Sequence, residues 1–186
     1  MRQYISTPLG NLSLLAKSSG VGGGAWDQAP RIFRKSVEPA LPDGMSVLGC
    51  HIVLLQCTPG EASEGVTFEC SWADDVPLCT GPETGEWLEA QGWEGLGYKI
   101  IVGTEDYDCF AKRLGPEIAI SASQHSVLYS ERGIRIQVGP LAGGIELSLH
   151  FVVSWNRPPD PADCSCWYAV GISHPTVLSH AHSEVG

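Results

Sequence analysis

The stretch Ile-Glu-Leu-Ser-Leu-His-Phe-Val-Val-Ser-Trp, residues 145–155, has a large apolar side chain at every odd position. The even positions include Glu146, Ser148, His150 and Ser154, all of which are polar. This period of two is typical of a half-buried β-strand, because successive side chains of a strand point to opposite faces of the sheet. The β-branched and aromatic residues of the stretch also suit a pleated surface. The stretch therefore predicts a strand and indicates a fold that depends on β-structure.

Two further strands are predicted beside residues 145–155. Residues 134–138 alternate and lead into a glycine-rich turn, and apolar side chains alternate again over residues 166–172, after a proline-rich loop. Strands that follow one another along the chain are usually neighbours in a sheet. We therefore expect a three-stranded meander in the last third of the chain.

Other strands are predicted upstream of this meander. Residues 4–16 predict a hairpin around a Pro-Leu-Gly-Asn turn, and residues 47–57 predict a strand that pairs with residues 66–72. Residues 27–46 contain three prolines and are predicted to be connecting structure. Shorter strands are predicted at residues 98–102, 118–122 and 126–129.

Two helices are predicted in the middle of the chain, over residues 83–91 and 105–114. The first has acidic residues in its first turn and Gly92 beyond its end. The second has Thr104 at the N-cap, acidic residues in its first turn and basic residues in its last turn. This order of charges complements the helix dipole at both ends.

Together these elements predict an α+β fold, with an antiparallel, largely meandering β-sheet and two short helices packed on one face. The length of 186 residues and the hydrophobic content of 43% suit a single domain that spans residues 1–186. We expect the tail, residues 175–186, to be flexible.

The sequence gives no sign of a membrane or an export segment. No window approaches the roughly 18 apolar residues of a membrane helix, and proline and glycine interrupt the first ten residues. The cysteines number seven, an odd count, and most lie in apolar runs, where a reduced thiol behaves as a small hydrophobic group. We therefore expect a cytoplasmic protein with free thiols.

The formal charge of −10 is concentrated in one part of the chain. Residues 61–108 contain twelve acidic residues against Lys99 alone, whereas the remainder has nine acidic and ten basic residues. An acidic surface repels nucleic acid and anionic membranes and attracts basic proteins. The charge pattern therefore predicts a basic protein partner and excludes nucleic acid and membrane as partners of this surface.

The leading functional hypothesis is a non-enzymatic binding domain that docks a basic protein through this acidic segment, with aromatic residues as anchors. A small, acidic, cytoplasmic α+β domain resembles the immunity proteins that neutralise bacterial toxins, although no shared motif supports the resemblance. The partner would then be a toxin domain. The predicted contact residues are Asp74, Asp75, Glu83, Glu86, Glu89, Trp93, Glu94, Glu105, Asp106 and Asp108.

An enzyme is the first alternative, although the sequence contains none of the common motifs of serine hydrolases, zinc proteases or P-loop proteins. His150 lies on the polar face of the strand over residues 145–155, beside Glu146 and two positions from Ser148. It could serve as an acid or base in a cleft, and the clustered carboxylates are further candidates for a hydrolase. A structural or oligomer-forming protein is the second alternative.

No cofactor or metal is predicted. Residues 20–25 satisfy the G-x-G-x-x-[GA] pattern of dinucleotide sites, but no helix-forming sequence follows them. Cys164 and Cys166, with His174, His180 and His182 in the tail, are the densest group of potential zinc ligands. Structural zinc sites favour cysteines separated by two to four residues, so a separation of one residue fits poorly.

Overall fold

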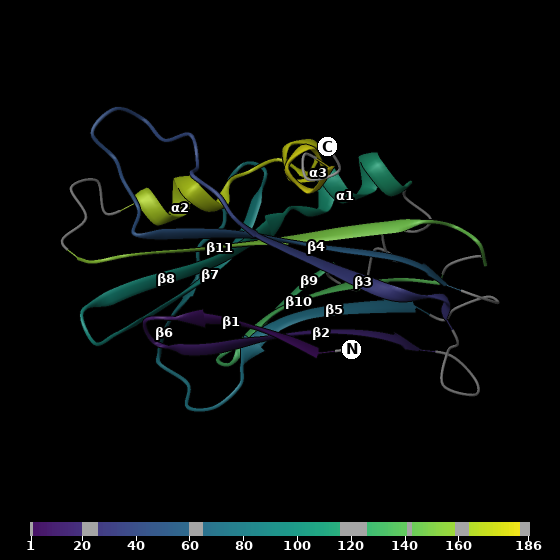
Figure 1. Ribbon diagram of the computed structural model, residues 1–186, viewed down its shortest axis with the longest axis horizontal. Coiled ribbons are helices and arrows are strands. Elements are labelled where there is room, and N and C mark those ends of the chain that lie inside the picture. Colours follow the sequence, from purple (N-terminus) through teal and green to yellow (C-terminus); the bar gives the residue numbers. More distant parts are fainter. Residues whose placement is uncertain are drawn as a thin grey trace.

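The computed structural model describes residues 2–19, 26–59, 65–115, 126–140, 143–158 and 164–182. Within these ranges the strands form two antiparallel sheets that stack face to face (Figure 1). Three short helices lie over the outer face of the larger sheet. None of the helices in the described ranges has the length and apolar content needed to cross a lipid bilayer.

The smaller sheet has five strands in the order β1-β2-β5-β10-β9. Its first two strands form a tight hairpin in which Thr7 pairs with Gly10. The Thr7 hydroxyl donates a hydrogen bond to the Gly10 carbonyl at 2.8 Å, which closes the turn. The strands are β1 (Arg2–Thr7), β2 (Gly10–Ser19), β5 (Gly65–Trp72), β9 (Val127–Ser130) and β10 (Gly133–Val138).

The larger sheet has six strands in the order β3-β4-β11-β8-β7-β6, so that β11 lies near its centre. A central strand pairs on both edges, and its side chains are covered on both faces by the second sheet and by the helices. The strands are β3 (Trp26–Ser36), β4 (Gly49–Pro59), β6 (Leu78–Pro82), β7 (Leu88–Gly95), β8 (Tyr98–Glu105) and β11 (Leu147–Asn156).

The main core lies between the two sheets. Phe151 of β11 packs on Phe68 of β5 with ring centroids 4.8 Å apart, and Trp72 meets Trp93 edge to face at 5.8 Å. All four rings are buried. Burial of a large apolar side chain contributes about 1.5–3 kcal/mol, so the apolar face of β11 and its partners supplies much of the stability.

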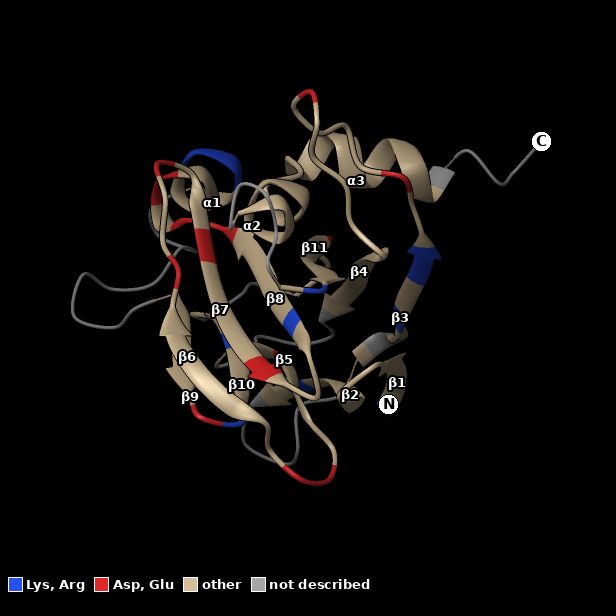
Figure 2. Ribbon diagram, turned by 90° about the vertical axis from the view of Figure 1, so that its left-hand side faces the viewer, with Lys and Arg blue, Asp and Glu red and all other residues tan. Residues whose placement is uncertain are grey.

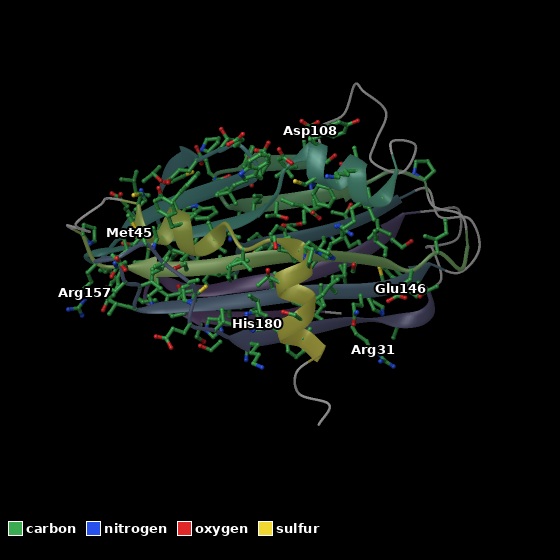
Figure 3. The ribbon with its side chains drawn as sticks, turned by 90° about the horizontal axis from the view of Figure 1, so that it is seen from above. Arg31, Met45, Asp108, Glu146, Arg157 and His180 are labelled. Carbon is green, nitrogen blue, oxygen red and sulfur yellow. The ribbon has the colours of Figure 1, made fainter. Side chains whose placement is uncertain are left out.

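A second apolar layer lies between the six-stranded sheet and the helices. The helices α1 (Tyr107–Leu114), α2 (Ser165–Val170) and α3 (His174–His182) lie over the sheet, and α3, which carries His180, runs across the strands (Figure 3). Val152 of β11 and Val170 of α2 are buried in this layer. The even-numbered face of β11 is therefore covered as well.

The α+β class, the antiparallel strand directions and several predicted elements are confirmed. The strand at residues 145–155 appears as β11, which begins at Leu147, and Ile145 before it is exposed. The second predicted helix appears as α1, with Asp106 as its N-cap in place of Thr104. The strands predicted over residues 4–16 form the β1–β2 hairpin.

The pairing predicted between residues 47–57 and 66–72 and the meander predicted in the last third of the chain are wrong, because the chain crosses between the two sheets. β4 and β5 lie in different sheets, and so do β10 and β11. Each of these strands has one face directed to the same core, so the alternation of side chains cannot distinguish the two sheets. Residues 27–46 are not simply connecting structure, because β3 occupies the first half of that range.

The helix predicted at residues 83–91 is wrong, because β7 begins at Leu88 within it. Gly92, interpreted as a helix stop, is instead a close-packed strand residue: a Cβ there would lie 2.4 Å from the Glu83 carboxylate and 2.5 Å from the Thr80 hydroxyl. The acidic residues before it belong to the β6–β7 connection and to the strand itself.

The strand predicted at residues 166–172 is wrong, because this segment forms α2. Its buried residues are Ser165, Cys166, Ala169 and Val170, a helical spacing that overlaps the alternating pattern in a segment this short. The tail that was expected to be flexible contains α3, which extends to His182. The strand predicted at residues 118–122 and the glycine motif at residues 20–25 lie outside the described residues.

Candidate functional site

A pocket of about 800 Å³ opens between α1, the segment that joins α2 to α3, and the outer face of β7 and β8. We call it the helix pocket. Its polar floor consists of Thr104, Glu105, Arg113 and His174. A concave apolar site with a few converging polar groups is the usual form of a small-molecule site. The walls are formed mainly by Trp87, Leu88, Trp167, Tyr168, Ile172 and Pro175.

The pairing of β8 with β11 brings Glu105 and His150 together. The two strands pair with Gly103 opposite Val152. Side chains alternate along a strand, so Glu105, two residues after Gly103, and His150, two residues before Val152, point to the same outer face of the sheet. At this level the Thr104 hydroxyl donates a hydrogen bond to the His150 carbonyl oxygen at 2.8 Å.

His174 reaches the same place from the first turn of α3. Ser173 precedes the helix, and its carbonyl accepts a hydrogen bond from the Val177 amide at 3.0 Å. Pro175 lies in the first turn, where proline's fixed φ suits a helix start. This start directs the His174 ring onto β11.

His150 and His174 form a buried histidine pair, with 2.8 Å between their Nδ1 atoms. The ring centroids are 5.0 Å apart. On the other side of His174, Nε2 lies 2.9 Å from the Ser148 hydroxyl. His150 in turn hydrogen-bonds the backbone of Ile172. Ser148, His174 and His150 are therefore linked in one chain of hydrogen bonds.

These contacts determine where the hydrogens lie. A neutral imidazole has one N–H and one acceptor nitrogen. Since Nδ1 of His150 already faces His174, we assign its hydrogen bond with the Ile172 backbone to the other nitrogen, Nε2, and its Nδ1 is then the acceptor. His174 must then donate from Nδ1, which leaves its Nε2 to accept the hydrogen of the Ser148 hydroxyl.

Arg113 and Glu105 form an ion pair at the edge of the histidine pair. The guanidinium donates from Nη2 to one carboxylate oxygen and from Nε to the other. Its Nη1 donates to the Ser148 carbonyl at 2.9 Å. Arg113 thus joins the last turn of α1 to β8 and β11, and it holds the carboxylate beside the histidines.

The electrostatics keep both histidines neutral. Burial lowers the pKa of His150 well below its ordinary value, and the nearby His174 and Arg113 lower it further. Burial and Arg113 lower the pKa of His174 to about 4. Burial raises the pKa of Glu105, although the hydrogen bond and charge of Arg113 oppose that rise. At neutral pH each imidazole therefore carries one lone pair, which can accept a hydrogen bond or coordinate a cation.

This arrangement can support two kinds of chemistry. One ligating atom from each of Glu105, His150 and His174 lies within 4.8 Å of the others, and two histidines with one carboxylate are a known set of metal ligands. Alternatively, the Ser148 hydroxyl lies beside His174, and His150 holds His174 in place. A hydroxyl, a base and a third group that orients the base are the arrangement that activates a nucleophile.

Four of the ten predicted docking residues are exposed at the surface. Acidic segments lie on β7, in the β5–β6 and β6–β7 connections and at the start of α1 (Figure 2), and Asp108 is labelled on α1 in Figure 3. Asp74, Asp75, Glu86 and Asp108 are exposed. Glu94 is half-buried.

Four of the predicted docking residues are half-buried or buried, and their carboxylates already form hydrogen bonds or ion pairs with other residues of the chain. Glu83 is paired with Lys99 at 3.1 Å, and Glu89 accepts a hydrogen bond from the Tyr129 hydroxyl. Asp106 accepts the Cys109 amide as N-cap at 2.8 Å, and Glu105 is buried against Arg113. The acidic segment therefore includes structural as well as exposed carboxylates.

Trp93 does not lie at the surface, contrary to its predicted role as a contact residue. Its side chain is fully buried between the sheets, and its Nε1 donates to the Glu131 carbonyl at 2.8 Å. Glu105 is likewise too buried to meet a partner. The exposed aromatic side chains near the acidic residues are those of Trp87 and Tyr107.

Among the described side chains, the potential zinc ligands Cys164, Cys166 and His180 do not gather with His174, which joins His150 and Glu105 instead. Cys166 is a buried residue of α2, and its thiol lies 3.9 Å from the Lys99 carbonyl oxygen. All seven cysteines are free thiols.

Sequence reasoning identified His150 and Ser148 as neighbours on a polar strand face, and the structure places both in the site. It paired His150 with Glu146, but Glu146 is exposed at the far end of the sheet, near Arg31 (Figure 3). Arg113 is one of the basic residues in the last turn of the helix predicted over residues 105–114, and that pattern gives no sign of a role in a site.

The chain matches no protein-family model, no curated protein and no solved structure.

Proposed function

We propose that this protein is an enzyme that acts on a small, largely apolar substrate bound in the helix pocket. The observation that carries the proposal is the buried histidine pair beside Glu105 at the polar floor. Burial of imidazoles and a carboxylate costs free energy unless protein groups replace their hydrogen bonds to water. Apolar side chains would fill the same space at lower cost, so chemistry on a bound molecule best explains the polar set.

The walls and floor indicate the class of substrate. Trp87, Trp167 and Tyr168 offer aromatic faces on which an apolar or ring-shaped group can stack. On the floor, the charges of Glu105 and Arg113 compensate each other. An uncharged substrate with one or two hydrogen-bonding groups, such as an ester, amide or glycoside, therefore suits this pocket better than an ion.

Hydrolysis is the reaction class that these side chains favour. Neutral imidazoles and a carboxylate can accept and release protons, as general acid–base catalysis requires. The Arg113 guanidinium lies on the floor, where it can stabilise an oxyanion that develops on the substrate. His174 is the central group, because it touches both His150 and Ser148 and also lines the pocket.

Ligand-observed NMR with a library of neutral aromatic fragments tests where small molecules bind. We expect fragments to bind the protein and to lose binding in Trp87→Ala, whose side chain is 66% exposed and whose removal costs little stability. Leu78→Ala, which removes an exposed apolar side chain elsewhere, is the matched control and should bind normally. Fragments that bind Trp87→Ala as well as the wild type would contradict the assignment of the pocket.

Turnover is then measured on ester, amide and glycoside derivatives of the fragments that bind. His174→Gln should retain fragment binding but lose turnover, whereas His180→Gln on the same helix should retain both. Equal turnover in His174→Gln and the wild type would refute the role of the histidine pair. A pocket that binds fragments but turns over none of their derivatives would indicate a carrier and contradict the enzyme proposal.

A second candidate function is docking of a basic protein, for example a toxin domain, to the acidic surface in the cytoplasm. Two exposed aromatic residues favour it: Trp87 follows Glu86, and Tyr107 precedes Asp108. Tryptophan and tyrosine residues that lie among charged residues are typical of interface hot spots. The seven free thiols are in keeping with a reducing compartment.

Affinity capture from the host at low and high salt tests this second candidate. Complementary charges speed association, and salt screens them over about 10 Å at 0.1 M. We expect a stoichiometric basic partner whose association rate falls with salt and falls again in the double variant Glu86→Lys, Asp108→Lys. An association rate that neither salt nor this variant changes would refute the docking surface.

A further inference from the structure

We infer that Glu105, His150 and His174 form a binding site for a divalent transition-metal cation such as Zn²⁺, with the remaining coordination position open to the helix pocket. This inference deepens the proposed function and rests on the same pocket, because it assigns the hydrolytic water to a metal ion. Three protein ligands and one open position are the usual form of a catalytic zinc site.

The distances are close to those of a coordination sphere. Metal–ligand distances of about 2.0–2.2 Å place tetrahedral ligand atoms about 3.3 Å apart. The two Nδ1 atoms now lie 2.8 Å apart with one hydrogen between them, and the carboxylate oxygen lies within 4.8 Å of both rings. Shifts of roughly half an ångström in the rings, with a larger approach of the carboxylate, would accommodate the ion.

The hydrogen-bond partners of the two rings suit metal ligation. A metal-bound histidine usually donates its second N–H to a carbonyl or another acceptor, which fixes the ring and its tautomer. His150 already presents Nδ1 as an acceptor while it hydrogen-bonds the Ile172 backbone. His174 can move its hydrogen from Nδ1 to Nε2 and donate it to the Ser148 hydroxyl, which can accept as well as donate. Both Nδ1 lone pairs are then free without loss of a proton.

Arg113 competes with the cation for the Glu105 carboxylate. Its guanidinium donates to both oxygens of Glu105, so one of these hydrogen bonds has to break before that oxygen can bind the metal. The Nη1 bond to the Ser148 carbonyl can hold Arg113 in place during this exchange. Arg113 therefore stays beside the open coordination position and at the floor of the pocket, where substrate would meet the metal.

The test is a titration of the chelator-treated, reduced full-length protein with Zn²⁺ alone, against a competing chromophoric chelator. We expect one Zn²⁺ per chain, and an affinity lowered at least about tenfold in His174→Ala and in Glu105→Gln. Cys109→Ser, which changes a thiol that also lines the pocket, and His180→Gln are matched controls and should bind as the wild type does. Circular dichroism confirms that each variant is folded.

Three results would overturn the inference. They are the absence of Zn²⁺ binding by the wild type, unchanged binding in His174→Ala, and loss of binding in Cys109→Ser. If the ligand variants fail to fold, the absorption spectrum of the Co²⁺-loaded wild type decides: a thiolate-to-cobalt charge-transfer band would contradict the proposed ligands, and tetrahedral bands without it would support them. Because no substrate is present, failure here leaves fragment binding and turnover, and with them the proposed function, intact.

Discussion

The histidine pair should make the protein unusually sensitive to mild acid. In the native state His150 and His174 are buried and neutral, and Arg113 opposes a positive charge on either ring. In the unfolded chain both rings titrate near their ordinary pKa of 6.5. Lowering the pH therefore protonates the unfolded state before the native state, and each proton taken up favours unfolding.

The size of the effect follows from His174. Its native pKa of about 4 lies below the unfolded value of 6.5, so its contribution to stability is complete above pH 6.5 and is lost as the pH falls towards 4. Between pH 7 and pH 4.5 this loss amounts to about 2 kcal/mol, since each pKa unit corresponds to about 1.36 kcal/mol. The lowered pKa of His150 acts in the same direction.

Urea unfolding followed by tryptophan fluorescence at pH 7.0, 6.0, 5.0 and 4.5 measures this loss. His174→Gln removes one member of the pair, so its free energy of unfolding should fall less over the same range, by about 2 kcal/mol. His180→Gln, on the same helix, should follow the wild type. Parallel pH profiles for the wild type and His174→Gln would refute the account of a neutral, buried pair.

Further predictions concern the fold. Trp93→Ala should cost about 3–5 kcal/mol of unfolding free energy because it empties the core between the sheets, whereas the exposed Trp87→Ala should change it by less than about 0.5 kcal/mol. Gly133→Ala should destabilise by at least about 1–3 kcal/mol, since its Cβ would lie 2.2 Å from a carbonyl oxygen of β5, whereas Gly171→Ala finds its nearest atom at 3.4 Å and should be tolerated. Leu96→Asn should stabilise by roughly 0.5–1 kcal/mol, because Leu96 is exposed in the β7–β8 turn with φ of 47°. Chemical denaturation measures the unfolding free energy of each variant. Equal losses in Trp93→Ala and Trp87→Ala, equal losses in Gly133→Ala and Gly171→Ala, or a destabilising Leu96→Asn would contradict the respective prediction.

Strong local patterns predicted the elements of the fold that carry them. β11 alternates along its length, and α1 has an acidic cap at one end and basic residues at the other, so both could be identified without tertiary information. Where local preference and burial disagree, burial decides. The acidic residues near Glu86 suggest a helix start, but Leu88 and Ala90 are buried beneath the helices on one face of β7.

The division into two sheets could not be predicted from alternation. Val66 to Trp72 and Leu147 to Trp155 both alternate, and in both strands the apolar face meets the same core from opposite sides. Alternation records which side chains are buried, and it does not record which sheet a strand joins. The helical segment at residues 165–170 is short enough to satisfy both periods.

The site was predicted only in part, because its members come from four separate segments. Glu105 ends β8, Arg113 lies in the last turn of α1, His150 lies on β11 and His174 begins α3. Their positions in the chain form no motif, and only the β8–β11 register and the start of α3 bring them together. The polar face of β11 was the one signal, since His150 and Ser148 stood out there as polar residues in an apolar strand.

The most direct test of the proposed site is a long-range ¹H–¹⁵N spectrum of the histidine side chains near pH 7, which reports the protonation and tautomer of each ring. The structure predicts two neutral imidazoles in the metal-free protein, with the hydrogen on Nδ1 of His174 and on the other nitrogen, Nε2, of His150. A doubly protonated ring at either position, or two rings that exchange freely with solvent, would contradict the buried pair on which the proposed chemistry depends.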